Sequence, residues 1–184
     1  MSVVIRPATA ADASALAALD ASYATGERLL ALASTGAPPE LDISMRWRDA
    51  TPRETVYAEY GEDRLRRALA KTDLFLVAEQ GRALLGLLMV IVPSWTDAGE
   101  ITDLVVDRKH RRSGAGRALV EAAAAWGRER SLRALWVEPR AENADAIEFY
   151  LALGFRLSGY NDRLHSNTDD APGQQTIYMY LELA

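Results

Sequence analysis

The chain has 184 residues, a length typical of one domain, and 49% of them are apolar and 26% charged. Its 21 Lys and Arg residues against 26 Asp and Glu give a net charge of −5. This balance argues against general nucleic-acid binding, which needs a basic face. The absence of cysteine excludes disulfides, thiolate metal sites and a cysteine nucleophile.

The N-terminus and the apolar runs predict a cytoplasmic protein that has no membrane partner. Residues 1–7 lack the charged start and the long apolar core of a signal peptide. The longest apolar run, over 83–92, is shorter than the ~20 residues that a membrane span needs. We found no repeat and no linker, so we expect a single domain over residues 1–184.

The first 71 residues predict short elements of both kinds. Apolar periodicity and capping residues indicate, in chain order, a strand over 2–6 closed by Pro7, a helix capped by Asp12 that runs to about Asp20, a helical stretch over 24–36, a strand over 41–47 and a helix over 61–71. Pro38-Pro39 marks a break after the second helical stretch.

The pattern is clearer from residue 74 onward. It predicts a β-hairpin over 74–78 and 83–92, a strand over 99–106, a helix over 114–130, a strand over 135–137, a helix over 143–153 and closing strands over 155–160 and 176–183. The segment 161–175 is a polar loop. An antiparallel hairpin that leads into β-α-β units indicates an α+β fold.

A basic, glycine-containing loop follows the strand over 99–106. It reads Arg111-Arg112-Ser113-Gly114-Ala115-Gly116-Arg117 and opens a helix. The first N–H groups of a helix have no internal partner, glycines permit close approach, and arginines add charge-assisted hydrogen bonds, so the loop suits a phosphate group. Two alternatives stay open, namely an exposed basic turn before a packing helix and a nuclear-localisation or nucleic-acid patch.

A second pattern lies downstream, in Asn143-x-x-Ala146-x-x-x-Tyr150-x-x-x-Gly154-Phe155. Asn143 and Tyr150 are about two helical turns apart and share one stripe of the helix, with the small Ala146 between them. A purely structural interpretation also fits, with Asn143 as helix N-cap, Gly154 as helix terminus and Tyr150 as a core aromatic.

Together, the two patterns resemble the GNAT acetyltransferase superfamily. Its signature is a strand, Arg/Gln-x-x-Gly-x-Gly/Ala opening a helix, a further strand, and Asn-x-x-Ala-x-x-x-Tyr-x-x-x-Gly-Phe. The resemblance covers residues 72–183 and implies a central mixed, twisted sheet of six to seven strands, splayed at the cofactor cleft and flanked by helices. It implies acetyl-CoA as co-substrate, and it leaves a homodimer open.

The resemblance also assigns residues to the cofactor. It implies that the backbone from Arg112 to Arg117 binds the pyrophosphate of coenzyme A, with Arg111 opening the motif. The strand end Leu104-Val105-Val106 would hydrogen-bond the pantetheine arm and the acetyl carbonyl. Asn143, Ala146 and Tyr150 would flank the other side.

A narrower resemblance points to streptothricin acetyltransferases, which acetylate an amine of a β-lysine group. It rests on Trp95, the run 101–107, Ala134-Leu135-Trp136, Gly159-Tyr160 and Ile177-Tyr178-Met179. The chain has Thr102 where that group often has Glu. If that Glu serves the substrate amine, the acceptor here differs.

An amine with a pKa of ~10.4 must lose a proton before it attacks a thioester. The candidate bases are Glu100 and Asp103, which a regular strand places on opposite faces, although a bulge would change that parity. Glu100 lies where some family members carry a catalytic Glu, and Asp103 matches the carboxylate of the streptothricin-like group. A base acting through water and a structural role for Asp103, by capping a turn or pairing with Arg, both stay open.

Tyr150 is the expected general acid, because a phenol pKa of ~10 is close to the pKa of ~8.5 of the departing thiol. Without cysteine, and with only His110 and His165, we expect direct transfer and no metal. The expected acceptor is a primary amine of a small molecule, including a β-lysine antibiotic. A protein or peptide amine, and an acyl-CoA-binding module without catalysis, are the alternatives.

Overall fold

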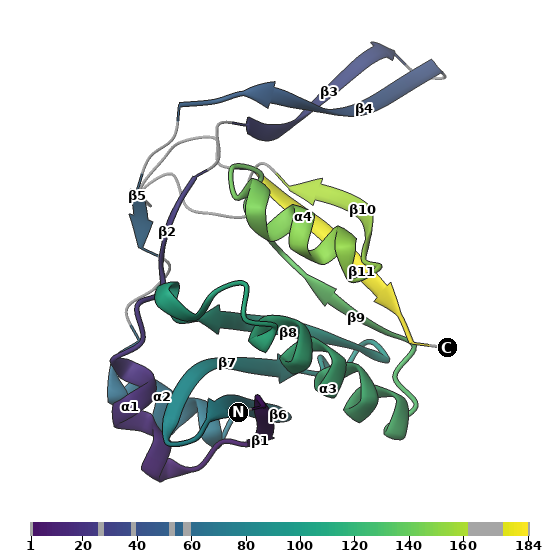
Figure 1. Ribbon diagram of the computed structural model, residues 1–184. Coiled ribbons are helices and arrows are strands. Elements are labelled where there is room, and N and C mark those ends of the chain that lie inside the picture. The colour runs from purple at the N-terminus through teal and green to yellow at the C-terminus, as the bar shows by residue number, and fades with distance from the viewer. Residues whose placement is uncertain are drawn as a thin grey trace. The chain divides into compact units, whose positions relative to one another are not determined.

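The computed structural model describes residues 2–25, 28–37, 40–51, 54–56, 60–161 and 175–183 (Figure 1). The chain forms two compact units. The first comprises residues 1–23, 56–137 and 181–184, and the second comprises residues 24–55 and 138–180. The prediction of a single domain over residues 1–184 stays a prediction.

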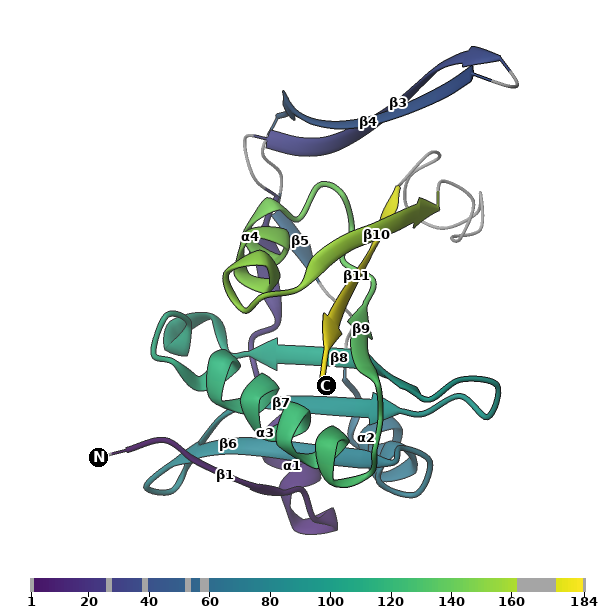
Figure 2. The same ribbon diagram turned by 90° about the vertical axis from the view of Figure 1, so that its right-hand side faces the viewer.

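The first unit is built on five strands, in the order β1-β6-β7-β8-β9. Their bounds are Val4–Pro7 for β1, Leu74–Gln80 for β6, Ala83–Ile91 for β7, Ala98–Val106 for β8 and Ala134–Val137 for β9. The first four pair antiparallel, and β8 pairs parallel with β9. Figure 2 shows β6, β7 and β8 side by side. The hairpin expected from residue 74 onward is confirmed.

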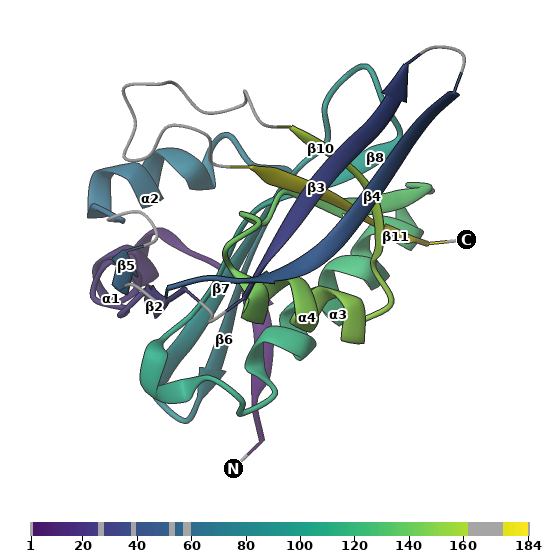
Figure 3. The ribbon, with the colours of Figure 1, turned by 90° about the horizontal axis from the view of Figure 1, so that it is seen from above.

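Helices cover both faces of this sheet. The short α1 (Ala13–Ala17) and α2 (Glu62–Leu69) lie on one side of β6 and β7, and α3 (Ala115–Glu129) lies on the other (Figure 3). On the α1 and α2 side, apolar side chains form a core that is removed from water, and this burial is the main stabilising contribution. That core contains Ala13, Leu16, Tyr60, Leu65, Phe75, Val77, Leu87, Met89 and Val105.

The first helix is shorter than predicted, and Asp12 does not cap it. The Asp12 side chain makes no capping hydrogen bond to α1. Its carboxylate instead accepts bonds from Arg6, with Nη2 to Oδ1 at 2.7 Å, and from the Thr9 backbone at 2.7 Å, at the start of the 3-10 turn Ala10–Asp12. Charge-assisted hydrogen bonds therefore occupy both of the oxygen atoms that a cap would use.

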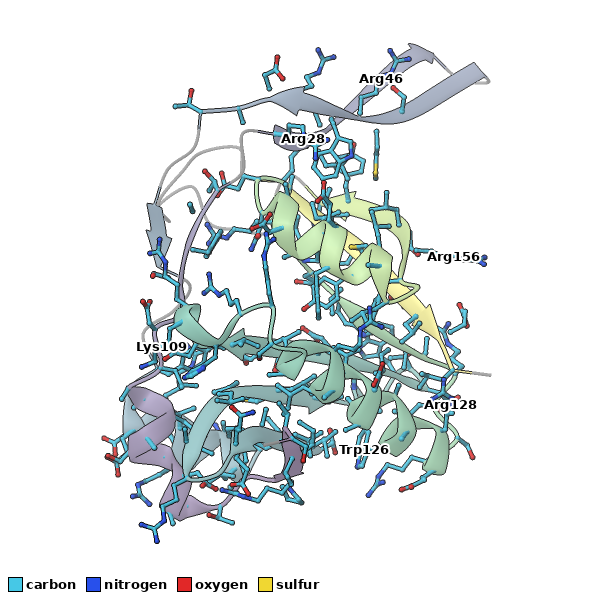
Figure 4. The ribbon with its side chains drawn as sticks, viewed as in Figure 1. Arg28, Arg46, Lys109, Trp126, Arg128 and Arg156 are labelled. Atoms are coloured by element: carbon cyan, nitrogen blue, oxygen red, sulfur yellow. The ribbon has the colours of Figure 1, made fainter. Side chains whose placement is uncertain are left out.

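The described residues of the second unit include the β-ribbon of β3 and β4, the helix α4 and the strands β10 and β11. Their bounds are Arg28–Ala37 for β3, Glu40–Asp49 for β4, Ala144–Ala152 for α4, Arg156–Asn161 for β10 and Thr176–Glu182 for β11. In Figure 4, Arg28 extends from β3, and its Nη2 lies 2.6 Å from Oε1 of Glu148 on α4. The strand predicted over 41–47 and the helix predicted over 143–153 are confirmed.

The helical stretch predicted over 24–36 is wrong, because its residues 28–36 belong to β3. Its alanines and leucines favour a helix, but ten residues of β3 pair in register with β4, from Arg28↔Asp49 to Ala37↔Glu40. This ladder of backbone hydrogen bonds outweighs an intrinsic preference of a few tenths of a kcal/mol per residue, roughly. The short strands β2 (Ser22–Ala24) and β5 (Glu54–Val56) also pair.

Strand β11 passes from the second unit into the first at Leu181, and the sheet has the hydrogen-bonded order β1-β6-β7-β8-β9-β11-β10. The predicted α+β fold, with a mixed sheet of six to seven strands and flanking helices, is confirmed.

Pro38-Pro39 and most of the predicted loop, residues 162–174, lie outside the described residues. Within the described ranges, no helix combines the length and apolar character that a membrane crossing requires.

Candidate active site

A β-bulge in β8 places the two candidate bases on one face. Opposite β7, the registered pairs run from Met89↔Asp103 to Val90↔Ile101 and Ile91↔Glu100, which leaves Thr102 as an extra residue. Residues two apart on a strand share a face, and so do cross-strand partners. Glu100 and Asp103 therefore share a face, as the bulge alternative in the sequence allowed.

The environment of Glu100 favours its neutral form. Burial raises the pKa of the Glu100 carboxyl above its ordinary value, and the negative charge of Asp103 raises it further. A carboxylate with a raised pKa is a stronger base, and perturbed carboxyls of this kind are common at catalytic sites.

Asp103 is tied to two residues that sequence reasoning did not single out. Its side chain is buried, with 8% of the residue exposed, and its Oδ1 accepts a hydrogen bond from the Tyr60 hydroxyl at 2.5 Å. The Arg64 guanidinium lies 3.6 Å from the same oxygen and stacks over the Tyr60 ring, 4.7 Å from its centroid. No sequence motif marks Tyr60 or Arg64, because their importance depends on a strand about 40 positions away.

The two neighbouring strands that were expected to separate at the cofactor cleft are β8 and β9, which pair over a short stretch only. Their registered pairs begin at Ala98↔Ala134 and end at Glu100↔Trp136. Within the first unit, no described residue of β9 pairs with β8 beyond Glu100, so the edge of residues 101–106 has backbone groups for a ligand. Leu104 and Val106 are half-buried, whereas the Val105 side chain lies in the core and only its backbone is available.

The loop after β8 forms an open helix N-terminus. Gly114 has a φ of +90° and precedes α3, Arg112 has a φ of 60°, and a side chain atom placed on Gly114 would meet nothing within 4 Å. No hydrogen bond among the described residues uses the N–H groups of 113–117. Free N–H groups, the positive end of a 15-residue helix and exposed arginines fit a phosphate group. The residues present therefore suit the pyrophosphate of coenzyme A.

The residues of this loop differ in the groups that they can present to a ligand. Ala115 is buried, so only its N–H group can face a ligand. Ser113 is exposed and Gly116 is half-buried. The Arg117 guanidinium lies 3.7 Å from Glu121, one turn further along α3.

Arg111 has a second use. Its Nε donates to the backbone oxygen of Val106 at 3.2 Å, and its Nη2 donates to the backbone oxygen of Ser22 at 2.5 Å. Buried Asp107 also accepts from the backbone of Asp20, at 3.3 Å. The basic turn, marked by Lys109 in Figure 4, therefore anchors the segment 20–22 to the end of β8.

The other predicted cofactor residues lie on α4 of the second unit. The Asn143 side chain accepts a hydrogen bond from the Ala146 backbone at 3.1 Å and caps the helix, as the structural interpretation of the sequence expected. Tyr150 is buried between Phe149 and Phe155, with ring centroids 5.2 Å and 5.1 Å away. The ligand roles of Asn143, Ala146 and Tyr150 stay predictions.

The first unit thus brings Glu100, Asp103, the open β8 edge and the phosphate-type loop into one compact body. Among the described residues, no three His, Asp or Glu side chains form a group suited to a metal ion. What this arrangement can do chemically is to hold a phosphate-bearing ligand along β8 and remove a proton beside it.

A family model described as Acetyltransferase (GNAT) family matches residues 41–155, and the chain belongs to this family. Over 119 residues, the chain is 33% identical to streptothricin acetyltransferase of Streptomyces lavendulae, which covers 65% of this chain and 62% of that protein. Over 73 residues, it is 36% identical to [ribosomal protein bS18]-alanine N-acetyltransferase of Escherichia coli K12, covering 40% and 49%.

The chain therefore matches between about half and 62% of the length of these curated relatives. The crystal structure of a nourseothricin acetyltransferase is similar over the full length of both chains, with a TM-score of 0.83 and 27% sequence identity. This similarity extends the agreement in fold to residues outside the segment that the family model matches.

Proposed function

We propose that this chain is an N-acetyltransferase that passes acetyl from acetyl-CoA directly to a primary amine of a small molecule. An antibiotic with a β-lysine amine is the first candidate acceptor. The observation that carries the proposal is the pairing of an open phosphate-type loop at 112–117 with two carboxylates on one face of the bulged strand that leads into it.

Acetyl-CoA, when bound, supplies the acetyl thioester. The N–H groups of 113–117 would hold its pyrophosphate, and the open edge of β8 would orient its arm. Leu104 to Val106 would hydrogen-bond the pantetheine arm through their backbone, and one of their N–H groups would donate to the carbonyl oxygen of the acetyl group. Their location at the end of β8, directly before the loop, supports this assignment.

In the proposed chemistry, a carboxylate of the chain takes the proton that the acceptor ammonium must lose. Glu100 is the preferred base, because its raised pKa strengthens it and Asp103 is already bonded to Tyr60. The nitrogen lone pair then forms the new C–N bond while the C–S bond breaks, and the nitrogen loses its second proton to solvent to give the neutral amide. We assign Tyr150 as the acid that donates a proton to the departing sulfur and is then reprotonated from solvent.

The acceptor assignment is supported by the similarity to two proteins named for streptothricin and nourseothricin acetylation. A peptide amine is the second candidate, because one segment is 36% identical to an enzyme named for acetylating an alanine of a ribosomal protein. A cytoplasmic location and a homodimer remain predictions, which cell fractionation and light scattering test.

The test measures free thiol release from acetyl-CoA with a panel of acceptors. The panel contains streptothricin-type and aminoglycoside antibiotics, lysine, and a peptide with an N-terminal alanine. We expect turnover with a streptothricin-type amine. Turnover restricted to the peptide would favour the second candidate, and binding of acetyl-CoA without turnover on any amine would favour a non-catalytic binding module.

A further inference from the structure

Three side chains of the first unit meet at one carboxylate oxygen. The Tyr60 hydroxyl donates to Asp103 Oδ1 at 2.5 Å, and an Arg64 guanidinium nitrogen lies 3.6 Å from the same atom. Arg64 also stacks over the Tyr60 ring, with 4.7 Å between its central carbon and the ring centroid. These contacts join the start of α2 to the bulged part of β8.

This arrangement determines which oxygen of Asp103 is available. A buried carboxylate needs hydrogen bonds and a nearby positive charge to remain ionised at low cost. Tyr60 supplies the hydrogen bond and Arg64 supplies the positive charge, and the two residues act on the same oxygen, Oδ1. Among the described residues, no side chain bonds to Oδ2, so this oxygen keeps its lone pairs for a ligand.

The neighbouring carboxylate has a different character. Glu100 shares the face of Asp103, is half-buried and has no hydrogen-bond partner among the described residues. One carboxylate is therefore held in place by protein groups, and the other is free to exchange a proton. Two carboxylates in different environments commonly divide binding and proton transfer between them.

We propose that Tyr60 and Arg64 are positioning residues, which hold Asp103 so that its Oδ2 binds the acceptor ammonium while Glu100 takes the proton. This inference rests on the proposed function. The ammonium donates one N–H to Asp103 Oδ2 and transfers the proton of a second N–H to Glu100. The neutral amine that results keeps its lone pair for the thioester, and Glu100 holds the proton until solvent accepts it.

Asp103 then contributes to acceptor binding and Glu100 to the rate. We expect Asp103→Asn to raise the KM for the amine by about tenfold, the usual effect of losing one bond between charged groups, without changing the KM for acetyl-CoA. Glu100→Gln is expected to lower kcat more than KM. A Tyr60→Phe variant, which keeps the ring and loses only the hydroxyl, is expected to raise the amine KM in the same direction as Asp103→Asn.

A double-mutant cycle tests whether Tyr60 acts through Asp103. If it does, the Tyr60→Phe/Asp103→Asn double variant has an amine KM no higher than Asp103→Asn alone. If the double variant instead multiplies the increases in amine KM of the two single variants, the residues act independently and the inference is overturned. A purely structural role for Tyr60 would lower the unfolding temperature of Tyr60→Phe and leave the amine KM unchanged, which would also overturn it.

Arg64 has a matched control on the same helix. Arg66 is about equally exposed and pairs with Glu62 at 2.6 Å, so Arg64→Met and Arg66→Met remove the same group from neighbouring positions. We expect Arg64→Met to raise the amine KM several-fold and Arg66→Met to leave it unchanged. Equal values in both would overturn the role of Arg64.

The wild-type protein separates this inference from the proposed function. Absence of thiol release with every acceptor overturns the proposed function, and this inference with it. Wild-type turnover combined with an unchanged amine KM in Tyr60→Phe overturns the inference alone.

Discussion

Glu100 and Asp103 lie on one face of β8 because the bulge at Thr102 inserts one residue between them. Without the bulge, residues three apart on a strand point to opposite faces. Because the two side chains share a face, the negative charge of Asp103 raises the pKa of Glu100 beyond the increase that burial causes. A single backbone irregularity thereby couples two carboxylates that the regular strand geometry would separate.

Removing the charge of Asp103 should change the pH dependence of the reaction. Both burial and the Asp103 anion raise the Glu100 pKa, so Asp103→Asn lowers it while the burial contribution remains. A base must be deprotonated to act, so the acid limb of kcat at saturating amine should move to lower pH. A limb that stays in place or moves to higher pH would contradict Glu100 as the base, and the isosteric Glu100→Gln should remove the limb.

Gly114→Ala should weaken acetyl-CoA binding. A residue with a side chain at φ +90° costs about 1–2 kcal/mol, although space around Gly114 is open. The loop relaxes to avoid this strain and moves its N–H groups, which reduces affinity up to about tenfold. Gly61→Ala is the matched control, because it has equal space and a φ of −65°. Calorimetric titration with unchanged affinity for Gly114→Ala would rule out the phosphate-loop assignment.

Tyr150→Phe should reduce kcat while preserving the fold. The phenyl ring keeps the packing against Phe149 and Phe155, and only the hydroxyl is lost. Loss of a general acid lowers the rate by about 10²–10⁴, and the KM for acetyl-CoA should stay the same. Thiol release at the wild-type rate would remove the acid role of Tyr150, and thermal unfolding checks that the variant is folded.

Gly86→Ala should destabilise the first unit. A Cβ at Gly86 would overlap the backbone oxygen of Val105, and β8 cannot move this oxygen away without losing its register with β7. We expect the free energy of unfolding to fall by about 1–3 kcal/mol, the usual cost of forcing atoms into a packed interior. Gly159→Ala is the control, since its nearest atom would be 3.6 Å away. Equal denaturation midpoints for the two variants would contradict this close approach.

Local patterns predicted the region from residue 74 onward well. The hairpin, β8, α3 and α4 follow from periodicity and from residues at their ends, such as the Asn143 cap and Gly114 before α3. The elements before residue 74 were harder to predict from local patterns. Residues 28–37 have a helical composition, and only their pairing with β4 makes them a strand.

By itself, the sequence determined the loop at 111–117, the Asn143 to Phe155 pattern and the family to which they belong, because spacing along the chain carries these features. The tertiary structure decided which side chains surround the carboxylates. The bulge at Thr102 follows from pairing with β7, and the bonds from Tyr60 and Arg64 to Asp103 join residues about 40 positions apart. Charge coupling and hydrogen bonding depend on distance in space, which a linear pattern does not contain.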